Sequence, residues 1–322
     1  MSDAIADLLR AHRRVVAACH EGADGDAIGS LRACGDALRA AGWDVALWAP
    51  GEAPLPADFA WLGYDDVARL PPADIGDRLL LALDCGSAER LGADGPAAVA
   101  AAAAAANLDH HGDNTRFAAV NEVDPAAACT TVLVRRLLAA LGITPTPRVA
   151  EAIYVGIVTD TGRFMYANAD AECHAVAGEM IALGVEPDAV FRRLYEGRPV
   201  ERVRLLARAL GSLELLCDGR LAVARVTIAD LDATGADEAD SDGVIDHLRA
   251  IRGVDVAAVI REPRAGGGLL RKASLRSARP GVDVARIAHA AGGGGHAMAA
   301  GFAMEASFED VTALIAAELA RA

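Results

Sequence analysis

The sequence predicts an α/β protein with an N-terminal doubly wound parallel sheet and a smaller α+β domain that has a mixed sheet. In the first half, short apolar runs alternate with stretches of helical spacing, which is the pattern of strand–helix–strand units. In the second half, strand-like runs outnumber the helices that could connect them in parallel, which indicates a mixed sheet. A chain of 322 residues is long enough for two such domains.

The elements of the first half follow from residue spacing. A strand over 15–19 ends at His20, and a helix over 26–41 carries apolar side chains at helical spacing before Gly42 ends it. The wholly apolar run 79–83 predicts a strand that is buried on both faces of a parallel sheet. The other predicted elements are a strand over 45–49, an alanine-rich helix from residue 97, a strand leading into Leu108, and helices over 130–141 and 149–158.

Beyond residue 190 the pattern changes. A long amphipathic helix is predicted over 191–216, linking an N-terminal domain of residues 1–190 to a second domain of residues 217–322. The elements predicted in the second domain are strands over 221–228, 254–261 and 269–277, a helix over 242–251, a glycine loop over 292–296 and a closing helix over 308–319.

The net charge of the chain argues against polyanionic binding partners. The chain has 31 basic against 45 acidic residues and a formal net charge of −14, which disfavours long nucleic acids and anionic membranes as ligands. No apolar run is long enough to span a bilayer, and the first residues lack the apolar core of a signal peptide. The six cysteines form no CxxC pair, so reduced thiols in a cytoplasmic protein are expected and a zinc–thiolate site is not.

Four clusters of acidic and histidine residues interrupt the first half, each where a strand or helix ends. They are HEGADGDAIGS (20–30), DCGS (84–87), LDHHGDN (108–114) and GIVTDTGRF (156–164). The carboxyl ends of parallel strands lie along one edge of a sheet, and ligands bind there. These clusters are therefore expected to converge.

The convergence of four carboxylates suggests a metal centre. Asp24, Asp26, Asp84 and Asp160 would repel one another in one crevice unless cations were present, and two divalent ions would balance their charge. Oxygen-rich ligation with imidazole suits Mn²⁺, and a metal pair activates water and stabilises in-line displacement at phosphorus. Taken singly, Asp26 could instead cap the helix that begins near Ala27, and Asp84 could be a turn residue.

Taken together, the motifs resemble a known family. The four clusters, followed by SLRS (274–277) and GGGGHAMAAG (292–301), resemble the DHH phosphoesterase superfamily with its DHH-associated C-terminal domain. The resemblance covers essentially the whole chain. Chain length and TDTGRF are most similar to the group of bifunctional oligoribonucleases and phosphoadenosine-phosphate (PAP) phosphatases.

The resemblance implies roles for individual residues. One Mn²⁺ would take His20 and Asp24, the other would take Asp26, His110 and Asp160, and Asp84 would bridge them.

The same resemblance implies roles beside the metals. His111 would face the substrate, holding the scissile phosphate or assisting the leaving group, and Asp109 would orient a histidine. Residues 217–322 would bind substrate, and residues 1–190 would carry the catalysis. The substrate-binding residues implied are His111, Arg276, Gly293, Gly294, Gly295 and His296.

The implied function is Mn²⁺-dependent hydrolysis of very short oligoribonucleotides, such as pApA and pGpG, and of the 3′-phosphate of PAP. The alternatives are a cyclic dinucleotide phosphodiesterase and a RecJ-type single-strand exonuclease, although 322 residues leave no room for an extra nucleic-acid-binding domain. A family II pyrophosphatase would lack the GGGGH motif. A catalytically silent nucleotide-binding regulator is the alternative outside the enzymes, and the complete set of expected ligands argues against it. The sequence does not determine the oligomeric state, and a homodimer is one possibility.

Overall fold

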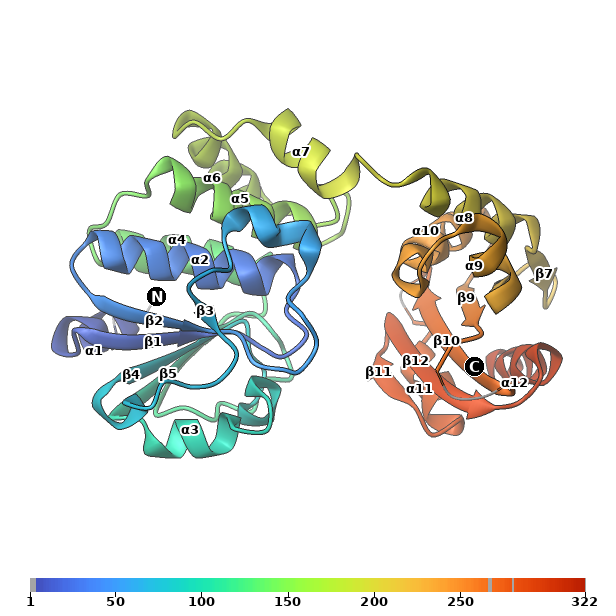
Figure 1. The fold of residues 1–322 in the computed structure, drawn as a ribbon, viewed down its shortest axis with the longest axis horizontal. Coiled ribbons are helices and arrows are strands. Elements are labelled where there is room, and N and C mark those ends of the chain that lie inside the picture. The colour runs from blue at the N-terminus through green and yellow to red at the C-terminus, as the bar shows by residue number, and fades with distance from the viewer. Residues whose placement is uncertain (1–3, 266–267, 280, 322) are drawn as a thin grey trace. The chain divides into compact units, whose positions relative to one another are not determined.

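The computed structural model of the chain describes residues 4–265, 268–279 and 281–321. It divides into two compact units, Met1–Glu196 and Gly197–Ala322 (Figure 1). The single helix predicted over 191–216 is wrong. That stretch holds the end of α7 (Pro187–Tyr195), then α8 (Val200–Gly211) and β7 (Glu214–Leu216). The break falls where Gly197 takes a φ of +70° and Pro199 cannot continue a helix from the residues before it.

The N-terminal unit is built on a six-stranded, wholly parallel sheet, as the sequence predicts. The strands lie in the order β3-β2-β1-β4-β5-β6, so the direction of winding reverses between β1 and β4. Their bounds are β1 (Arg14–Ala18), β2 (Asp44–Trp48), β3 (Val67–Ala68), β4 (Leu79–Leu83), β5 (Ala104–Asp109) and β6 (Val120–Val123). Because β3 has two residues and β6 is half-buried with Asn and Glu at its centre, neither gives a strand pattern in the sequence.

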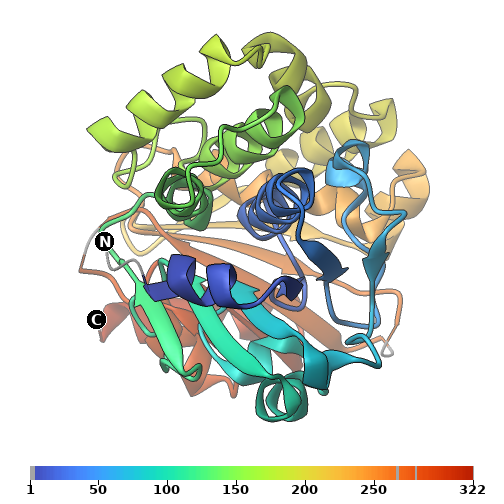
Figure 2. The same ribbon diagram turned by 90° about the vertical axis from the view of Figure 1, so that its left-hand side faces the viewer.

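Helices cover both faces of this sheet (Figures 1 and 2). Leu79, Leu81 and Leu83 of β4 pack in the core beneath the larger helical layer, whereas Leu80 and Ala82 pack on the opposite face, which confirms a strand buried on both sides. The larger layer contains α1 (Ala4–Ala11), α2 (Gly25–Ala40), α4 (Thr130–Ala140), α5 (Pro147–Asp160), α6 (Ala171–Ala182) and α7; the other face carries α3 (Gly95–Ala101). Short 3₁₀ helices lie at Ala57–Leu62, Ile75–Asp77 and Ala88–Leu91 (η1 to η3).

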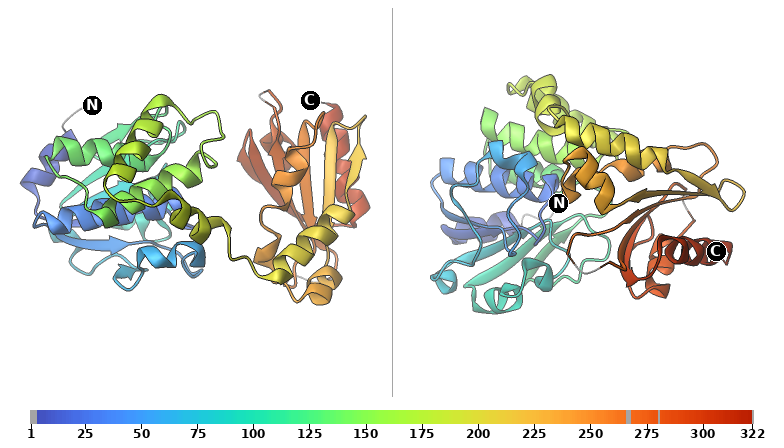
Figure 3. Two further views of the ribbon diagram at one scale, coloured as in Figure 1. Left: turned by 90° about the horizontal axis from the view of Figure 1, so that it is seen from above. Right: turned by 45° about the vertical axis from the view of Figure 1, so that its right-hand side comes forward.

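The C-terminal unit has a mixed sheet, also as predicted, with helices on both faces (Figure 3). Strands β8 and β9 are parallel, and the other neighbours pair antiparallel in the order β11-β12-β10-β9-β8-β7. The remaining bounds are β8 (Leu221–Val226), α9 (Ile228–Thr234), η4 (Glu238–Ser241), α10 (Val244–Arg249), β9 (Val256–Arg261), β10 (Leu270–Ser277), α11 (Val284–Ala290), β11 (Gly294–His296), β12 (Ala299–Glu305) and α12 (Phe308–Ala320).

The glycine run differs from the loop that the sequence predicts. Residues 294–296 form β11, which pairs antiparallel with β12 at the edge of the sheet. A Cβ on Gly293 would lie 2.2 Å from the carbonyl oxygen of Gly301, so this close approach of two chain segments requires glycine. The run therefore has a packing role besides any role in binding.

No helix in the part of the chain that the structure describes is long and apolar enough to cross a membrane.

Candidate metal centre

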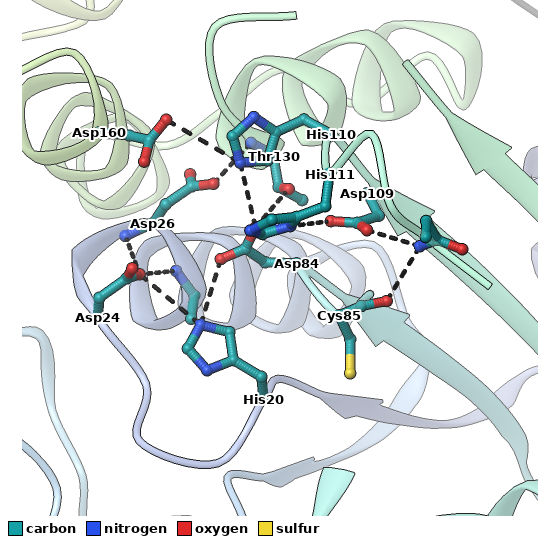
Figure 4. A network of polar contacts seen from close by, with 12 residues as sticks. His20, Asp24, Asp26, Asp84, Cys85, Asp109, His110, His111, Thr130 and Asp160 are labelled. Atoms are coloured by element: carbon teal, nitrogen blue, oxygen red, sulfur yellow. Dashed lines mark hydrogen bonds and ion pairs between the residues drawn. The ribbon is translucent and has the colours of Figure 1, made fainter. Parts of the chain in front are cut away.

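The four clusters do come together at the carboxyl edge of the N-terminal sheet, beside the point where its winding reverses (Figure 4). Each side chain sits where a regular element begins or ends, so the backbone of that element fixes its position. The residues are His20 after β1, Asp24 and Asp26 at the start of α2, Asp84 after β4, Asp109 to His111 at the end of β5, and Asp160 at the end of α5.

Asp84 lies at the centre of the cluster. Its backbone has a φ of +56° and its side chain is buried, so it turns out of β4 directly into the site. Oδ2 lies 3.6 Å from His20 Nε2 and Oδ1 lies 3.6 Å from His110 Nε2, while the Thr130 hydroxyl donates a hydrogen bond of 2.9 Å to Oδ1. One carboxylate thus faces a different histidine with each of its oxygens.

The surroundings hold the Asp84 carboxylate in its charged form. Burial alone would raise its pKa, but the contact with His20 and the charges of His110, His20 and His111 bring that pKa down to about 2. Thr130 adds a hydroxyl donor that the sequence analysis missed, because nothing in an apolar helix start distinguishes one threonine from another.

His20 and Asp24 form one side of the cluster. His20 Nδ1 lies 2.9 Å from the carbonyl oxygen of Glu21, and Nε2 lies 4.0 Å from Asp24 Oδ1. If Nδ1 donates its proton to that carbonyl, Nε2 keeps a free lone pair that faces the carboxylates, as a metal-binding histidine requires. Asp24 also caps α2, where its Oδ1 accepts hydrogen bonds from the backbone N–H groups of Asp26 and Ala27.

Asp26 does not cap the helix on which it sits, which was the alternative that its sequence position allowed. Its two oxygens accept hydrogen bonds from the backbone N–H groups of Thr130 (2.6 Å) and Thr131 (2.9 Å), at the start of α4. The side chain is buried, and burial together with the negative charges of Asp84, Asp160 and Asp24 raises its pKa well above the ordinary value.

His110 and Asp160 form the other side. His110 Nε2 lies 4.0 Å from Asp160 Oδ2, and the Asn168 amide donates to the same oxygen and to the Asp160 carbonyl. Burial raises the pKa of Asp160 to about 6; the negative charges of Asp84 and Asp24 act in the same direction, and His110 opposes them. Asn168 is a second residue that the sequence analysis missed, because it lies beyond the motif in an exposed turn.

His111 belongs to a separate hydrogen-bonded chain. Its Nδ1 lies 2.8 Å from Oδ1 of the fully buried Asp109, whose Oδ2 accepts a hydrogen bond of 2.6 Å from Asn114. The hydrogen bond to Asp109 raises the pKa of His111 to about 9, although burial acts in the opposite direction. Asp109 thus fixes both the orientation of the His111 ring and its proton.

The donors fit divalent cations. Two groups have ligand atoms that all lie within 4.8 Å of one another, namely His20, Asp24 and Asp84, and Asp84, His110 and His111. Asp84 is common to both. Burial, helped by the neighbouring carboxylates, raises the pKa values of Asp26 and Asp160, so their negative charge is poorly compensated in the metal-free protein, and a divalent cation would correct this imbalance.

This imbalance predicts a pH-dependent effect of metal on stability. Because the pKa of Asp160 in the folded protein, about 6, exceeds its ordinary value, ionising it destabilises the metal-free fold as the pH rises through that range. A cation bound at this carboxylate would compete with the proton, so we expect Mn²⁺ to raise the unfolding temperature more at about pH 7.5 than at about pH 5. Thermal unfolding with and without Mn²⁺ measures this. Equal shifts at both pH values would contradict it, and Asp160→Asn should reduce the difference.

The residues expected to bind substrate from the C-terminal unit lie on two strands that flank β12. Arg276 on β10 and His296 on β11 both pair with Ala299, so the three residues lie in line across the sheet with their side chains on one face. Leu275 packs in the core on the opposite face. Arg276 Nη1 donates only to the carbonyl oxygen of Leu275 among the described residues, which leaves most of the guanidinium free.

Comparison with known proteins places the chain in a family. Residues 14–157 match the model of the DHH family N-terminal domain, and residues 218–321 match that of the DHHA1 domain. The bifunctional oligoribonuclease and PAP phosphatase NrnA of Thermus thermophilus is 33% identical over 329 aligned residues, covering 99% of this chain and 94% of that protein. The chain belongs to the DHH family.

Solved structures share the fold of this DHH protein. An exopolyphosphatase-related protein from Bacteroides fragilis, 23% identical, superposes with a TM-score of 0.90 over 99% of this chain and 95% of its own. RecJ from Thermus thermophilus in complex with Mn²⁺, 17% identical, has a TM-score of 0.54, covering 99% of this chain and 54% of its own.

Proposed function

We propose that this DHH protein hydrolyses the phosphodiester bonds of very short oligoribonucleotides, such as pApA and pGpG, and the 3′-phosphate of PAP, with two Mn²⁺ ions. The observation that carries the proposal is the position of Asp84, which is shared by two groups of side chains that could hold a metal ion, at the carboxyl edge of the sheet. The 33% identity to a protein named as an oligoribonuclease and PAP phosphatase supports the choice of substrates.

The ligand set that we propose has Asp84 between the two ions. When bound, they would activate water and neutralise the charge that develops on the phosphate. We propose His20 and Asp24 as ligands of one ion, Asp26, His110 and Asp160 as ligands of the other, and Asp84 as a ligand of both. His111 also has a ring nitrogen grouped with Asp84 and His110, but we assign it to the substrate.

His111 would act on the substrate itself. In the metal-free protein its pKa is raised to about 9, so there it carries a proton on each ring nitrogen at neutral pH, and we propose that it is in this form when it meets the substrate phosphate. The Nδ1 proton is held by Asp109, so Nε2–H is the donor that remains for a phosphate oxygen or for the leaving group. In this proposal Asp109 is a positioning residue, since it acts through His111.

The C-terminal unit would grip a phosphate of the substrate, and residues 1–196 would carry the catalysis. Arg276 and His296 share one face of the sheet, and a guanidinium is well suited to grip a phosphate with two hydrogen bonds. We also propose that Gly293, Gly294 and Gly295 offer backbone N–H groups beside them, and that the enzyme works in the cytoplasm, which its free cysteines favour.

Arg276→Ala should weaken substrate binding more than turnover. Losing a charge-assisted contact costs about 1.5 to 3 kcal/mol, so we expect KM for pApA to rise about tenfold or more with a smaller change in kcat. Steady-state kinetics measure both, and Arg252→Ala is the matched control, since Arg252 is an exposed arginine of the same unit. An unchanged KM would remove Arg276 from the site.

A substrate panel tests the proposal as a whole. Catalytic efficiency under Mn²⁺ is measured for di- to hexanucleotides, PAP and cyclic dinucleotides. We expect the highest values for dinucleotides and PAP, with a steep fall as length increases. Preference for a cyclic dinucleotide, or for the longest strand, would favour the phosphodiesterase or the RecJ-type alternative instead. Binding without turnover of any member would identify a regulator.

A further inference from the structure

A cavity of about 320 Å³ opens beside the metal centre, on the same edge of the N-terminal sheet. Its walls come from the segments that follow β1, β2, β3 and β4, including Glu21, Pro50, Arg69 and Leu91. Glu21 is the residue after His20, and its own backbone contacts the His20 ring, so the cavity adjoins the proposed ligands directly. Its size is that of a small-molecule site.

Glu21 places an exposed carboxylate at this cavity. Its carboxylate has no hydrogen-bond or ion-pair partner within residues 4–265, 268–279 and 281–321. It lies between two glycines of positive φ: a Cβ on Gly51 would be 3.0 Å from Glu21 Oε1, and one on Gly92 would be 3.7 Å from Oε2. The two glycines thus make room for the carboxylate between the loops that line the cavity.

Arg69 holds one of the lining loops in place. Its Nη2 donates to the carbonyl oxygens of Gly51 (2.6 Å) and Ala53 (2.7 Å), which ties the loop after β2 to the end of β3. Its Nη1 is buried without a hydrogen-bond partner in the described part of the chain. Arg69 therefore makes its hydrogen bonds to the loop through Nη2, and it forms no ion pair with Glu21.

We propose that this cavity binds the nucleoside part of the substrate, with Glu21 accepting a hydrogen bond from a ribose hydroxyl or a base N–H group. The inference rests on the proposed function. The three carboxylates of Glu21, Glu52 and Asp94 line the cavity against one arginine, so a phosphate would be repelled whereas a neutral group rich in donors would be favoured. The apolar walls formed by Pro50, Leu70 and Leu91 suit the faces of a sugar and a base.

Glu21→Gln tests the acceptor while preserving the shape of the side chain. We expect kcat/KM for pApA to fall about tenfold or more, mainly through KM, because a hydrogen bond to a charged group is lost. The affinity for Mn²⁺, measured by calorimetry, should stay within about twofold. Glu186→Gln, which alters an exposed glutamate whose side chain caps no helix, is the matched control and should change neither quantity.

A binding measurement separates this inference from the proposed reaction. Adenosine is titrated against the metal-free full-length protein and followed by saturation-transfer NMR. Leu70→Trp fills the cavity at a position that is 66% exposed, so the fold should tolerate it, and both this variant and Glu21→Gln should weaken the contact. If the unmodified protein turned over none of the nucleotides, the proposed function would fail and this titration alone would decide the inference.

The outcomes are distinct. Loss of discrimination between pApA and its 2′-deoxy counterpart in Glu21→Gln would assign the contact to the ribose, and loss of discrimination among pApA, pGpG and pUpU would assign it to the base; either supports the inference. An unchanged KM, an equal fall in Mn²⁺ affinity, or identical adenosine binding by all variants would overturn it.

Discussion

Asp84→Asn should lower the hydrolysis of pApA by about a thousandfold or more, and reduce the Mn²⁺ bound per chain. Asparagine keeps the volume of the side chain and tolerates the φ of +56° better than alanine does, so the change removes charge with little backbone strain. The loss is large because each oxygen of Asp84 faces a different histidine, and both proposed ions depend on this one carboxylate. Initial rates and metal analysis of the purified protein measure the two effects.

Asp65→Asn is the matched control, because it removes a carboxylate from an exposed position in the same unit. We expect this variant to retain its activity and its metal. The unfolding temperature of metal-free Asp84→Asn should fall below that of the parent protein at neutral pH, because the folded protein holds the pKa of Asp84 at about 2, below its ordinary value, so the ionised carboxylate stabilises the fold. Near-normal hydrolysis in Asp84→Asn would refute the shared ligand.

His111→Ala should reduce kcat by about a hundred- to ten-thousandfold while the Mn²⁺ content stays unchanged. The reason is that Nδ1 is engaged by Asp109 and that His111 is not among the metal ligands that we propose. Rates under saturating substrate and metal analysis distinguish this role from ligation. A parallel loss of metal would make His111 a ligand, as its proximity to Asp84 and His110 also permits.

Asp109→Asn is the companion variant. The amide keeps a contact to His111 but no longer holds its charged form, so kcat should fall by less than in His111→Ala while KM changes little. If Asp109→Asn lost its fold, as a buried group with two hydrogen bonds could, Asn114→Ala would test the same chain from its other end.

The sequence could predict that the side chains of the candidate metal centre gather, because they sit at element ends that the parallel sheet brings together. Asp84 is the first polar residue after a wholly buried strand, and His110 and Asp109 come at the end of the next. That pattern depends only on strand burial and on the geometry of a parallel sheet. The gathering of these side chains is therefore readable from the residue pattern, whereas the assignment of ligands to the two ions rests on the family resemblance.

The residues that donate hydrogen bonds to these carboxylates from distant parts of the chain could not be predicted in the same way. Thr130 reaches Asp84 across 46 positions, and Asn168 reaches Asp160 from a turn without regular structure. The helix predicted over 191–216 failed for a different reason. Arginine and leucine keep helical spacing across the segment, and only Gly197 and Pro199 signal that two short helices replace one.

Asp26 links the candidate metal centre to the packing of α4. Its oxygens are anchored by two amides at the beginning of α4, so the same carboxylate that we assign to a cation also secures a helix remote in sequence. A cation bound at the centre would therefore make the start of α4 more rigid. The amide hydrogens there should exchange with solvent more slowly when the cation is bound. A carboxylate placed at another position could supply the same charge, but it would not accept the two hydrogen bonds that anchor the start of α4.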